Sequence, residues 1–413
     1  MPNDKQYWKP TGGYDFKLKI DDLDYSQDLA RVKILSSITA PYQTILLTLN
    51  LDPNDIILKR LYGQSTFKLT IFLDGADNKT REQLIFDLMY ITSEFQIPTR
   101  AMQTTGIQKD RSQFIVPTIC IKPFEYMNTM VNQVYHAKKM DEIINDLVGN
   151  TDADIEFETT GLNTNTFDQV MVPPMTLYKS LKYLDRVLGI YNGIAIMYCL
   201  FDGTIYIKNL NQKMNMSQVF TMYQVASGDE EFKKIAEKCA DGKHFYTSKE
   251  VTTTYNGNAA FSVLSPVLRY ITKPKDALYK VIEKDLDEFC LEYGILSSKD
   301  SEIYHNSNVI KPDKRITYYT NQIGNGDDET FINANLSKAI SSLSTLSMDM
   351  DRDMMLLNLM HVGESVLFIS KTLEMNQFSG KYILKSSEIN FDRGGTWEGA
   401  ARIHLIRTNK SSN

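Results

Sequence analysis

The chain has 413 residues, 42% of them hydrophobic and 23% charged, and its formal net charge is −6 at pH 7. Because single hydrophobic cores rarely grow beyond roughly 250 to 300 residues, this length allows two to four domains of an ordinary globular protein. The mildly acidic balance argues against a protein that grips nucleic acid through clustered Lys and Arg, and no apolar run approaches the ~20 residues of a membrane-spanning helix.

The N-terminal part of the chain is predicted to be mainly β-structure. Phe16, Leu18 and Ile20 alternate with lysines, as expected for a half-buried strand. An acidic turn with a proline then predicts a short helix over residues 56–61, and residues 80–95 are expected to be helical or mixed. The expected strands of this part cover residues 14–20, 44–51, 67–71 and 114–121.

The next part, residues 125–210, changes to a pattern of helices followed by a hairpin. Apolar spacing predicts a helix over residues 140–149 and a second, strongly amphipathic helix over residues 176–188. The apolar stripe of the second helix consists of Leu177, Leu181, Leu184 and Leu188. Asp202 and Gly203 between two apolar runs predict a β-hairpin over residues 194–207, onto which the leucine stripe is expected to pack.

The remainder of the chain is predicted to contain two helices and then a return to β-structure. The first helix is expected over residues 229–240. The second is expected to begin at Asp276, which would cap it, and to stop at Gly294. The expected strands near the C-terminus cover residues 366–369, 382–384, 389–391 and 402–407.

A faint internal repeat connects the two ends of the chain. Residues 52–71 and 351–369 share an acidic turn, a short helical segment, a Gly-Gln-Ser or Gly-Glu-Ser triplet and an apolar strand. The alignment needs a one-residue gap. This repeat predicts that residues 14–121 and about 330–408 form two superposable small β-barrels with a helical insert between them.

Cysteine and tyrosine usage favours assembly over chemistry. The four cysteines (Cys120, Cys199, Cys239 and Cys290) lie far apart and form no Cys-x-x-Cys pair, so they are expected to be reduced and semi-buried. The chain also has 23 tyrosines and only 5 histidines. Tyrosine suits strands and protein interfaces, because it combines a large apolar ring with a polar tip.

One acidic run resembles the start of a calcium-binding loop. Asp349, Asp351 and Asp353 have the right spacing, but such a loop also needs glycine at its sixth position and glutamate at its twelfth. Those positions hold Met354 and Met360 here. A polar turn is therefore the favoured interpretation.

No other segment predicts a catalytic or ligand-binding site. The histidines are never at metal-ligand spacing from one another or from a cysteine, and no nucleophile, phosphate-binding or dinucleotide motif occurs. The acidic segment 325–329 and the basic pairs 233–234 and 273–275 are interpreted as solvated surface. The histidines are His136, His244, His305, His361 and His404. We therefore predict no catalytic, cofactor-binding or metal-binding residues, no cofactor, and a protein that is not an enzyme.

Three stretches, in this order and spacing, carry a family resemblance. The first is residues 32–51, the second is residues 174–210, and the third is residues 362–408. Their most distinctive parts are Ser36-Ser37-Ile38 with Pro41-Tyr42, Gly189-Ile190-Tyr191 with Asp202-Gly203-Thr204, and Val362-Gly363-Glu364 with Gly380-Lys381-Tyr382. Together they resemble the baseplate hub family of contractile-tailed bacteriophages, which is similar to the N-terminal hub part of type VI secretion spike proteins.

The resemblance implies an α+β, mainly β, fold with two tail-tube-like β-barrel domains and helix-containing inserted domains. The implied boundaries are 1–122 for the first barrel, 123–210 for a helix-plus-hairpin domain, 211–335 for a mixed region, and 336–413 for strands of the second barrel. It also implies a homotrimer in the virion baseplate, assembled in the host cytoplasm. Its implied partners are the central spike, the tail tube or a tube-initiator protein, and the baseplate wedge, while DNA passes through without specific binding.

Two other functions stay open at this level. A tail-associated peptidoglycan hydrolase would need two carboxylates, or a Cys/His or zinc site, converging in a cleft. The hub of a secretion system or tailocin would share the implied architecture and differ in its genomic neighbours.

Overall fold

The structure of the chain is a computed structural model, and the residues that it describes fall into separate ranges. The described residues are 13–52, 55–56, 67–74, 81–86, 90–96, 118–151, 154–191, 195–200, 204–210, 218–226, 230–255, 267–272, 280–285, 316–319, 344–350, 356–371 and 378–407.

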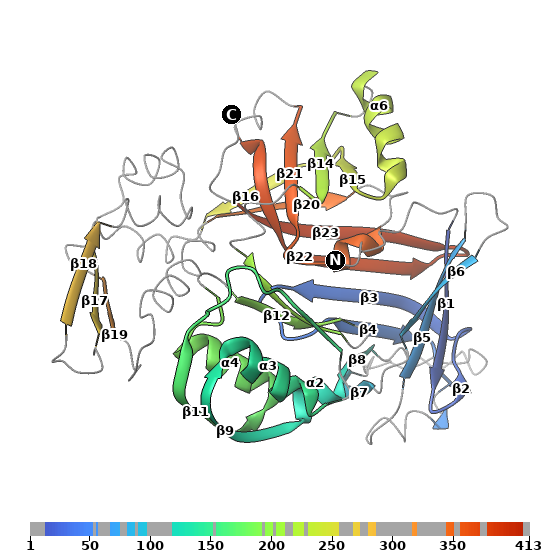
Figure 1. Ribbon diagram of the computed structural model, residues 1–413. Helices are drawn as coiled ribbons and strands as arrows, with labels where there is room; N and C mark the ends of the chain where they lie inside the picture. The colour runs from blue at the N-terminus through green and yellow to red at the C-terminus, as the bar shows by residue number, and fades with distance from the viewer. Residues whose placement is uncertain are drawn as a thin grey trace, which may run out of the picture.

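The centre of the fold is a run of antiparallel strands inside a 15-stranded sheet (Figure 1). Each strand of the run pairs with the next in an antiparallel register. In spatial order they are β16 (Val251–Tyr255), β20 (Ser344–Met350), β23 (Trp397–Arg407), β22 (Gly380–Arg393), β3 (Leu29–Ser37), β4 (Thr44–Leu49), β8 (Thr118–Pro123) and β7 (Tyr90–Gln96). We call these eight strands the central run.

Two groups of strands branch from the central run. One group continues from β23 and consists of β1 (Gly13–Ile20), β2 (Leu23–Asp24), β5 (Phe67–Asp74) and β6 (Arg81–Phe86). The other group continues from β22 and consists of β21 (Ser365–Ser370), β14 (Phe220–Gln224) and β15 (His244–Thr247), with β14 parallel to both of its neighbours. Strands from both ends of the sequence therefore share one hydrophobic core, in which Val32 and Ile34 pack with Ile389 and Phe391.

The central run contains the same strand order twice. In the first block, made of β3, β4, β7 and β8, the order in space is β3-β4-β8-β7. In the second block, made of β16, β20, β22 and β23, the order in space is β16-β20-β23-β22. If the four strands of each block are numbered 1 to 4 along the sequence, their order in space is 1-2-4-3 in both blocks. The two blocks meet where β22 pairs with β3.

The faint sequence repeat coincides with this repeated order. In each block a strand outside the central run, β5 or β21, follows the second strand in sequence, and these are the strands that come after the Gly-Gln-Ser and Gly-Glu-Ser triplets. In the second block, the 3-10 helix η2 (Leu356–Met360) occupies the predicted helical segment. Residues 57–61 of the first copy lie outside the described residues. That the two copies superpose as barrels stays a prediction.

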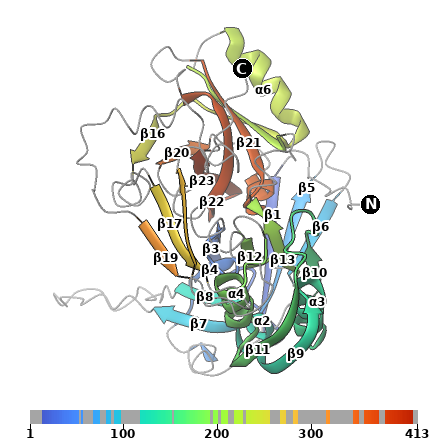
Figure 2. The ribbon, with the colours of Figure 1, turned by 60° about the vertical axis from the view of Figure 1, so that its left-hand side comes forward.

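A helix-containing unit lies between β8 and β14 in the sequence (Figure 2). Its elements are α2 (Phe124–Asn128), β9 (Met130–Lys139), α3 (Met140–Gly149), β10 (Ile155–Phe157), β11 (Thr166–Thr176), α4 (Leu177–Val187), β12 (Ala195–Cys199) and β13 (Ile205–Asn209). It has its own hydrophobic core. The predicted hairpin is confirmed, because β12 and β13 pair antiparallel.

The predicted amphipathic helix is also confirmed as α4. Leu181 and Leu184 are fully buried in the same core as Met197 and Ile207 of the hairpin. The helix ends at Val187, two residues before Gly189, whose φ of 73° lies in the left-handed region that glycine adopts without strain. Its amide donates to the carbonyl oxygens of Leu184 and Asp185.

The remaining elements include α6 (Glu230–Lys238) with η1 (Cys239–Asp241), which confirm the helix predicted over residues 229–240. A separate three-stranded sheet consists of β17 (Val267–Thr272), β18 (Lys280–Asp285) and β19 (Ile316–Tyr319). Of the helices in the described ranges, none has the length and apolar character needed to cross a membrane.

Two secondary-structure predictions are wrong. Residues 80–95 were expected to be helical or mixed, but β6 and β7 lie there and pair with β5 and β8. The helix predicted from Asp276 to Gly294 contains a strand, β18, which pairs with β17. In both places pairing with a neighbouring strand overrides the local helical spacing.

Candidate functional site: a paired-charge face on the central sheet

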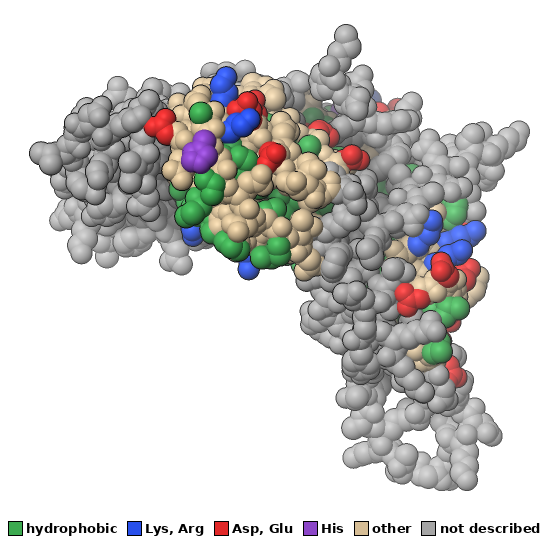
Figure 3. Space-filling model, turned by 60° about the horizontal axis from the view of Figure 1, so that its bottom comes forward, with side chains coloured by type: hydrophobic (Ala, Val, Ile, Leu, Met, Phe, Trp, Pro, Cys, Tyr) green, Lys and Arg blue, Asp and Glu red, His purple; other side chains and the backbone are tan. Residues whose placement is uncertain are grey.

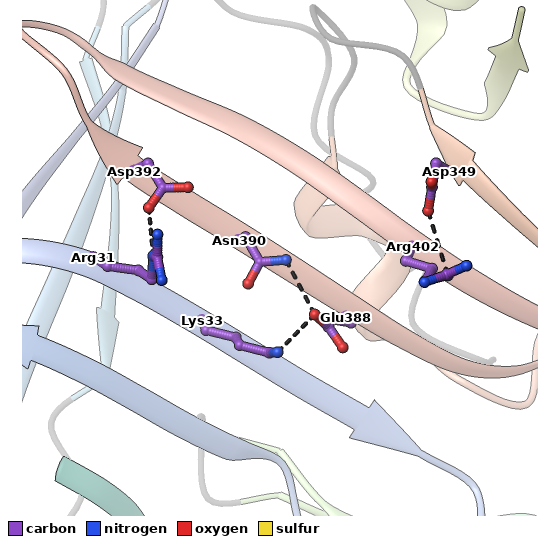
Figure 4. Close-up of polar contacts among 7 residues, drawn as sticks. All are labelled: Arg31, Lys33, Asp349, Glu388, Asn390, Asp392 and Arg402. Carbon is purple, nitrogen blue, oxygen red and sulfur yellow. Dashed lines mark hydrogen bonds and ion pairs between the residues drawn. The ribbon is translucent and has the colours of Figure 1, made fainter. Parts of the chain in front are cut away.

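The face of the central run opposite the hydrophobic core carries alternating charged side chains. In β3, Val32 and Ile34 are buried, whereas Arg31 is exposed and Lys33 is half-buried. The same alternation runs along β22 and β23. We call the outward residues Arg31, Lys33, Asp349, Glu388, Asn390, Asp392 and Arg402 the paired-charge face (Figure 4).

Each cation of the paired-charge face contacts a carboxylate on a neighbouring strand. Arg31 pairs with Asp392, and Lys33 Nζ lies 2.6 Å from Glu388 Oε1. Both of these pairs cross from β3 to β22, so they join the two blocks. A third pair links β23 to β20, where Arg402 Nε lies 3.4 Å from an Asp349 oxygen. The three positive charges are therefore matched by three negative ones.

The central carboxylate of the face, Glu388, is held in its ionised form. Partial burial alone would raise its pKa, but hydrogen bonds from Lys33 and Asn390 and the positive charges of Lys33 and Arg402 outweigh this and lower the pKa below its ordinary value. Glu388 is therefore ionised near neutral pH and neutralises Lys33. Because the side chains of these pairs are partly exposed to solvent, the pairs contribute little to folding stability and act mainly on the local potential.

A serine and a histidine lie beside the paired-charge face on β20 and β23. The oxygen of Ser347 and Nδ1 of His404 are 2.7 Å apart. Partial burial, and then the positive charges of Arg402 and Lys385, lower the pKa of His404, so the ring is neutral at pH 7. No carboxylate hydrogen-bonds the other ring nitrogen in the described part of the chain, and the pair sits on an open sheet. It lacks the orienting group that nucleophilic serine chemistry uses.

A second exposed surface lies on the ribbon of β9 and β11. Val134 and Met171 lie opposite each other and are 48% and 59% exposed, and Met130 is 63% exposed. Figure 3 looks onto this side of the molecule, from below in the view of Figure 1, and shows hydrophobic side chains in the open. The opposite side of the ribbon is buried against the helices.

The hairpin β12–β13 joins the helix-containing unit to the central sheet. It is buried on both faces, because Ile196 and Tyr198 belong to the main core while Met197 and Cys199 belong to the core of the helix-containing unit. The backbone of the hairpin also bonds to the loop after β3, where the Gln43 amide donates to the Cys199 carbonyl oxygen. The hydrophobic cores of the central sheet and of the helix-containing unit therefore lie against the two faces of the same hairpin.

A buried polar cluster holds this junction. Lys208 Nζ lies 3.4 Å from Glu364 Oε1 and 3.3 Å from the Tyr198 hydroxyl, and it stands 4.5 Å from the centre of the Tyr206 ring. Tyr198 donates a 3.0 Å hydrogen bond to the Val362 carbonyl oxygen. The Lys208 and Glu364 side chains are 4% and 2% exposed. Burying such a charge pair costs desolvation free energy, and this cost is offset only while both charges and their hydrogen-bond partners remain in place.

The Val362-Gly363-Glu364 segment, which the sequence singled out by the family resemblance and, in part, by the internal repeat, supplies one side of the junction. Gly363 has a φ of +80°, and a Cβ there would lie 2.3 Å from Ile196 Cδ1. The positive φ favours glycine at this position, and a larger residue would also require the end of the Ile196 side chain to move.

The other residues considered as candidate sites are scattered. Among the described residues, no three His, Cys, Asp or Glu side chains form a group that could hold a metal ion. Asp349 belongs to the paired-charge face, whereas Asp351, Asp353 and residues 325–329 lie outside the described residues. His136 is exposed on β9, and His305 lies outside the described residues.

The remaining polar and sulfur groups have structural surroundings. His244 contacts Asp241 at 2.7 Å near α6. Cys199 and Cys239 are buried free thiols, as expected, and burial raises the pKa of Cys239 to about 12. Lys233 and Lys234 are exposed on α6, as predicted for solvated surface, and residues 273–275 lie outside the described residues.

Sequence reasoning missed both polar clusters. The alternation of Arg31 and Lys33, and of Glu388, Asn390 and Asp392, was readable as outward-facing strand positions. Their pairing depends on the β3–β22 register, which joins residues 361 positions apart for the Arg31–Asp392 pair.

Comparisons with known proteins show which solved structures share this fold. The family model described as the bacteriophage PBS1 gene 109 protein matches residues 110–230. A solved tail protein from Neisseria meningitidis MC58 has a TM-score of 0.57 at 9% identity, with 96% of this chain and 97% of that chain covered. The chain has the fold of a phage tail protein.

A second solved structure shares this tail-protein fold. The 43 kDa tail protein of prophage MuSo2 from Shewanella oneidensis has a TM-score of 0.56 at 12% identity, with 96% of this chain and 98% of that chain covered. The mainly β tail-protein fold inferred from the sequence is thus found in structures of nearly the same length. No curated protein matches the chain by sequence.

Proposed function

We propose that the chain is a structural hub subunit of a contractile phage baseplate. It forms a homotrimer that joins a hexameric tail tube to a trimeric central spike, contacts wedge proteins, and leaves a channel for DNA. The observation that carries this proposal is the repeated strand order of the two blocks. Two equivalent blocks in each of three chains present six equivalent units to a six-fold partner, while the chain itself keeps three-fold symmetry.

The two-barrel organisation belongs to this proposal. The first block with β1, β5 and β6 would make one tube-like barrel, and the second block with β14, β15 and β21 would make the other. The helix-containing unit would lie between the two barrels, after β8 and before β14. The sheet of β17, β18 and β19 would be an insertion between β16 and β20 of the second barrel. The structural likeness to the solved tail proteins supports the fold alone, and the proposed role rests on the block repeat.

The oligomeric state tests this role. We expect light scattering with the purified full-length chain and its spike protein to give three copies of the chain per particle. Measurement without the spike shows whether the ring closes alone. A particle with two copies, or an open polymer that grows with concentration, contradicts the hub proposal.

In this ring the paired-charge face would line the channel. Because Arg31, Lys33 and Arg402 are each matched by a carboxylate on a neighbouring strand, these three side chains would hold DNA less strongly than unpaired cations. Duplex DNA would therefore pass without being held. A non-enzymatic role is part of this proposal, and the charge pairing of this face agrees with it.

Neutralising the carboxylates of this face is expected to create DNA binding. In the double variant Asp392→Asn with Glu388→Gln, Arg31 and Lys33 lose their partners, so duplex DNA should bind with an affinity that falls as salt rises, by a slope of about 0.9 per phosphate neutralised. The wild-type chain should show no retention in the same gel-shift or anisotropy titration.

The matched control changes the net charge equally at another place. The double variant Glu237→Gln with Glu250→Gln removes two exposed carboxylates outside the paired-charge face. It is expected to bind DNA no better than the wild type. If both double variants bind DNA equally well, the net charge of the chain alone determines DNA binding, and the assignment of the paired-charge face to the channel wall is wrong.

A further inference from the structure

The solvent face of α4 carries three cations in a row. Lys179, Lys182 and Arg186 are exposed, whereas Leu181 and Leu184 on the opposite side of the helix are buried. Positions three and four residues apart lie on the same face of a helix. Since each residue adds 1.5 Å along the helix axis, the cations form a row about 10 Å long.

Within the described residues, no carboxylate pairs with this row. Lys179, Lys182 and Arg186 make no ion pair in that part of the chain, and the acid within α4, Asp185, is only 4% exposed. The paired-charge face differs, because each of its cations contacts a carboxylate on a neighbouring strand. The basic face of α4 therefore keeps a positive charge that its neighbours do not cancel.

The two other long helices in the described ranges lack such a face. α3 contains three acids and no cation, and its Glu142 and Asp146 accept hydrogen bonds from the Lys139 amide and the Tyr135 hydroxyl. α6 contains three glutamates and three lysines, so its charges cancel. Among these helices the uncompensated positive charge is therefore particular to α4, in a chain whose formal net charge is −6.

Helix stability does not explain the row of cations. The N-terminal end of a helix carries a partial positive charge, so its first turn favours acids and disfavours cations. Lys179 lies in the first turn of α4, which contains no acid, and the N-cap residue Thr176 makes no side-chain capping hydrogen bond. Lys179 therefore lies where a positive charge opposes the helix dipole, which is better explained by a role in binding.

Two tyrosines beside the cations suit a protein partner. Tyr178 and Tyr183 are half-buried on the same helix. Lys182 Nζ lies 4.7 Å from the centre of the Tyr178 ring, and that ring packs edge-on against the buried Tyr126 ring at 5.5 Å between centroids. Tyr178 is thus held by the core while it supports Lys182. Tyrosine and arginine are enriched at protein interfaces, where they often dominate the binding energy.

We infer that the basic face of α4 is a docking site for an acidic protein segment whose carboxylates are spaced by about one helical turn. Facing rows of opposite charge fix the register of two protein surfaces. A protein segment is favoured over duplex DNA, because three cations release few counterions and the chain as a whole is acidic. The inference stands on α4 and does not depend on the proposed hub role.

Peptide binding tests this docking site. The probe is a fluorescent alanine-based peptide with glutamates three and four positions apart on one helix face, titrated with the full-length chain at low salt. We expect the wild type to bind it, and the triple variant Lys179→Gln, Lys182→Gln and Arg186→Gln to bind about tenfold more weakly. Added salt should weaken the wild-type complex. Because glutamine favours helix, circular dichroism should show an unchanged fold.

The matched control removes three lysines from α6. The triple variant Lys233→Gln, Lys234→Gln and Lys238→Gln changes the net charge equally and should bind the peptide as the wild type does. An equal loss in both triple variants, or no binding by the wild type at low salt, would overturn the inference. Short duplex DNA is titrated in parallel. If DNA binds as strongly as the peptide and depends on the α4 cations, the face binds nucleic acid and the inference is wrong.

Discussion

Replacing Lys208 with methionine is expected to destabilise the folded chain by about 3 to 5 kcal/mol. Lys208 and Glu364 are both almost completely buried at the hairpin junction, and removal of the lysine leaves the Glu364 carboxylate in an apolar interior without its cation. Such a charge must either be desolvated or take up a proton, and both cost free energy. Urea unfolding of the full chain measures the effect.

The double variant Lys208→Met with Glu364→Leu separates a lost charge partner from lost packing. We expect it to recover most of the stability, because well-packed apolar replacements for a buried pair are often neutral or stabilising. Lys138→Met removes an exposed pair with Glu142 and is expected to cost less than about 1 kcal/mol. A loss in the double variant as large as in Lys208→Met would show that the pair does not act as a charge pair.

Truncation of the leucine stripe of α4 is expected to have an effect of similar size. Leu184→Ala should lower the free energy of unfolding by about 2 to 5 kcal/mol, because the Leu184 side chain is fully buried in the core of the helix-containing unit. Chemical denaturation followed by circular dichroism measures the change.

The matched control for this helix is Lys179→Ala. Lys179 is exposed on α4, so its replacement should change stability by no more than about 0.5 kcal/mol. Equal effects at residues 179 and 184 would mean that the buried stripe does not stabilise this unit.

The elements that the sequence predicted well are those whose pattern is local. The alternation of Phe16, Leu18 and Ile20 appears in β1, where all three side chains are buried. The leucines of α4 and the hairpin signal at residues 202–203 were equally readable, because helical spacing and a two-residue turn need only a few neighbouring positions.

The elements and contacts that the sequence missed depend on strand pairing. Residues 81–86 form β6 because β5 offers a paired edge, and residues 280–285 form β18 because β17 does. Likewise, Arg31 and Asp392 could each be placed on an outer face, but only the strand register brings them together. The faint repeat hinted at two blocks, whereas their shared strand order appears only in the sheet topology.

An electron cryomicroscopy map of the assembled tail tip tests the hub proposal most directly. We expect three copies of the chain around a channel wide enough for duplex DNA, with six equivalent strand blocks around the axis and the paired-charge face of Arg31, Lys33, Glu388 and Asp392 turned toward the channel. A ring of another copy number, or a map in which these four residues face away from the axis, would contradict the account.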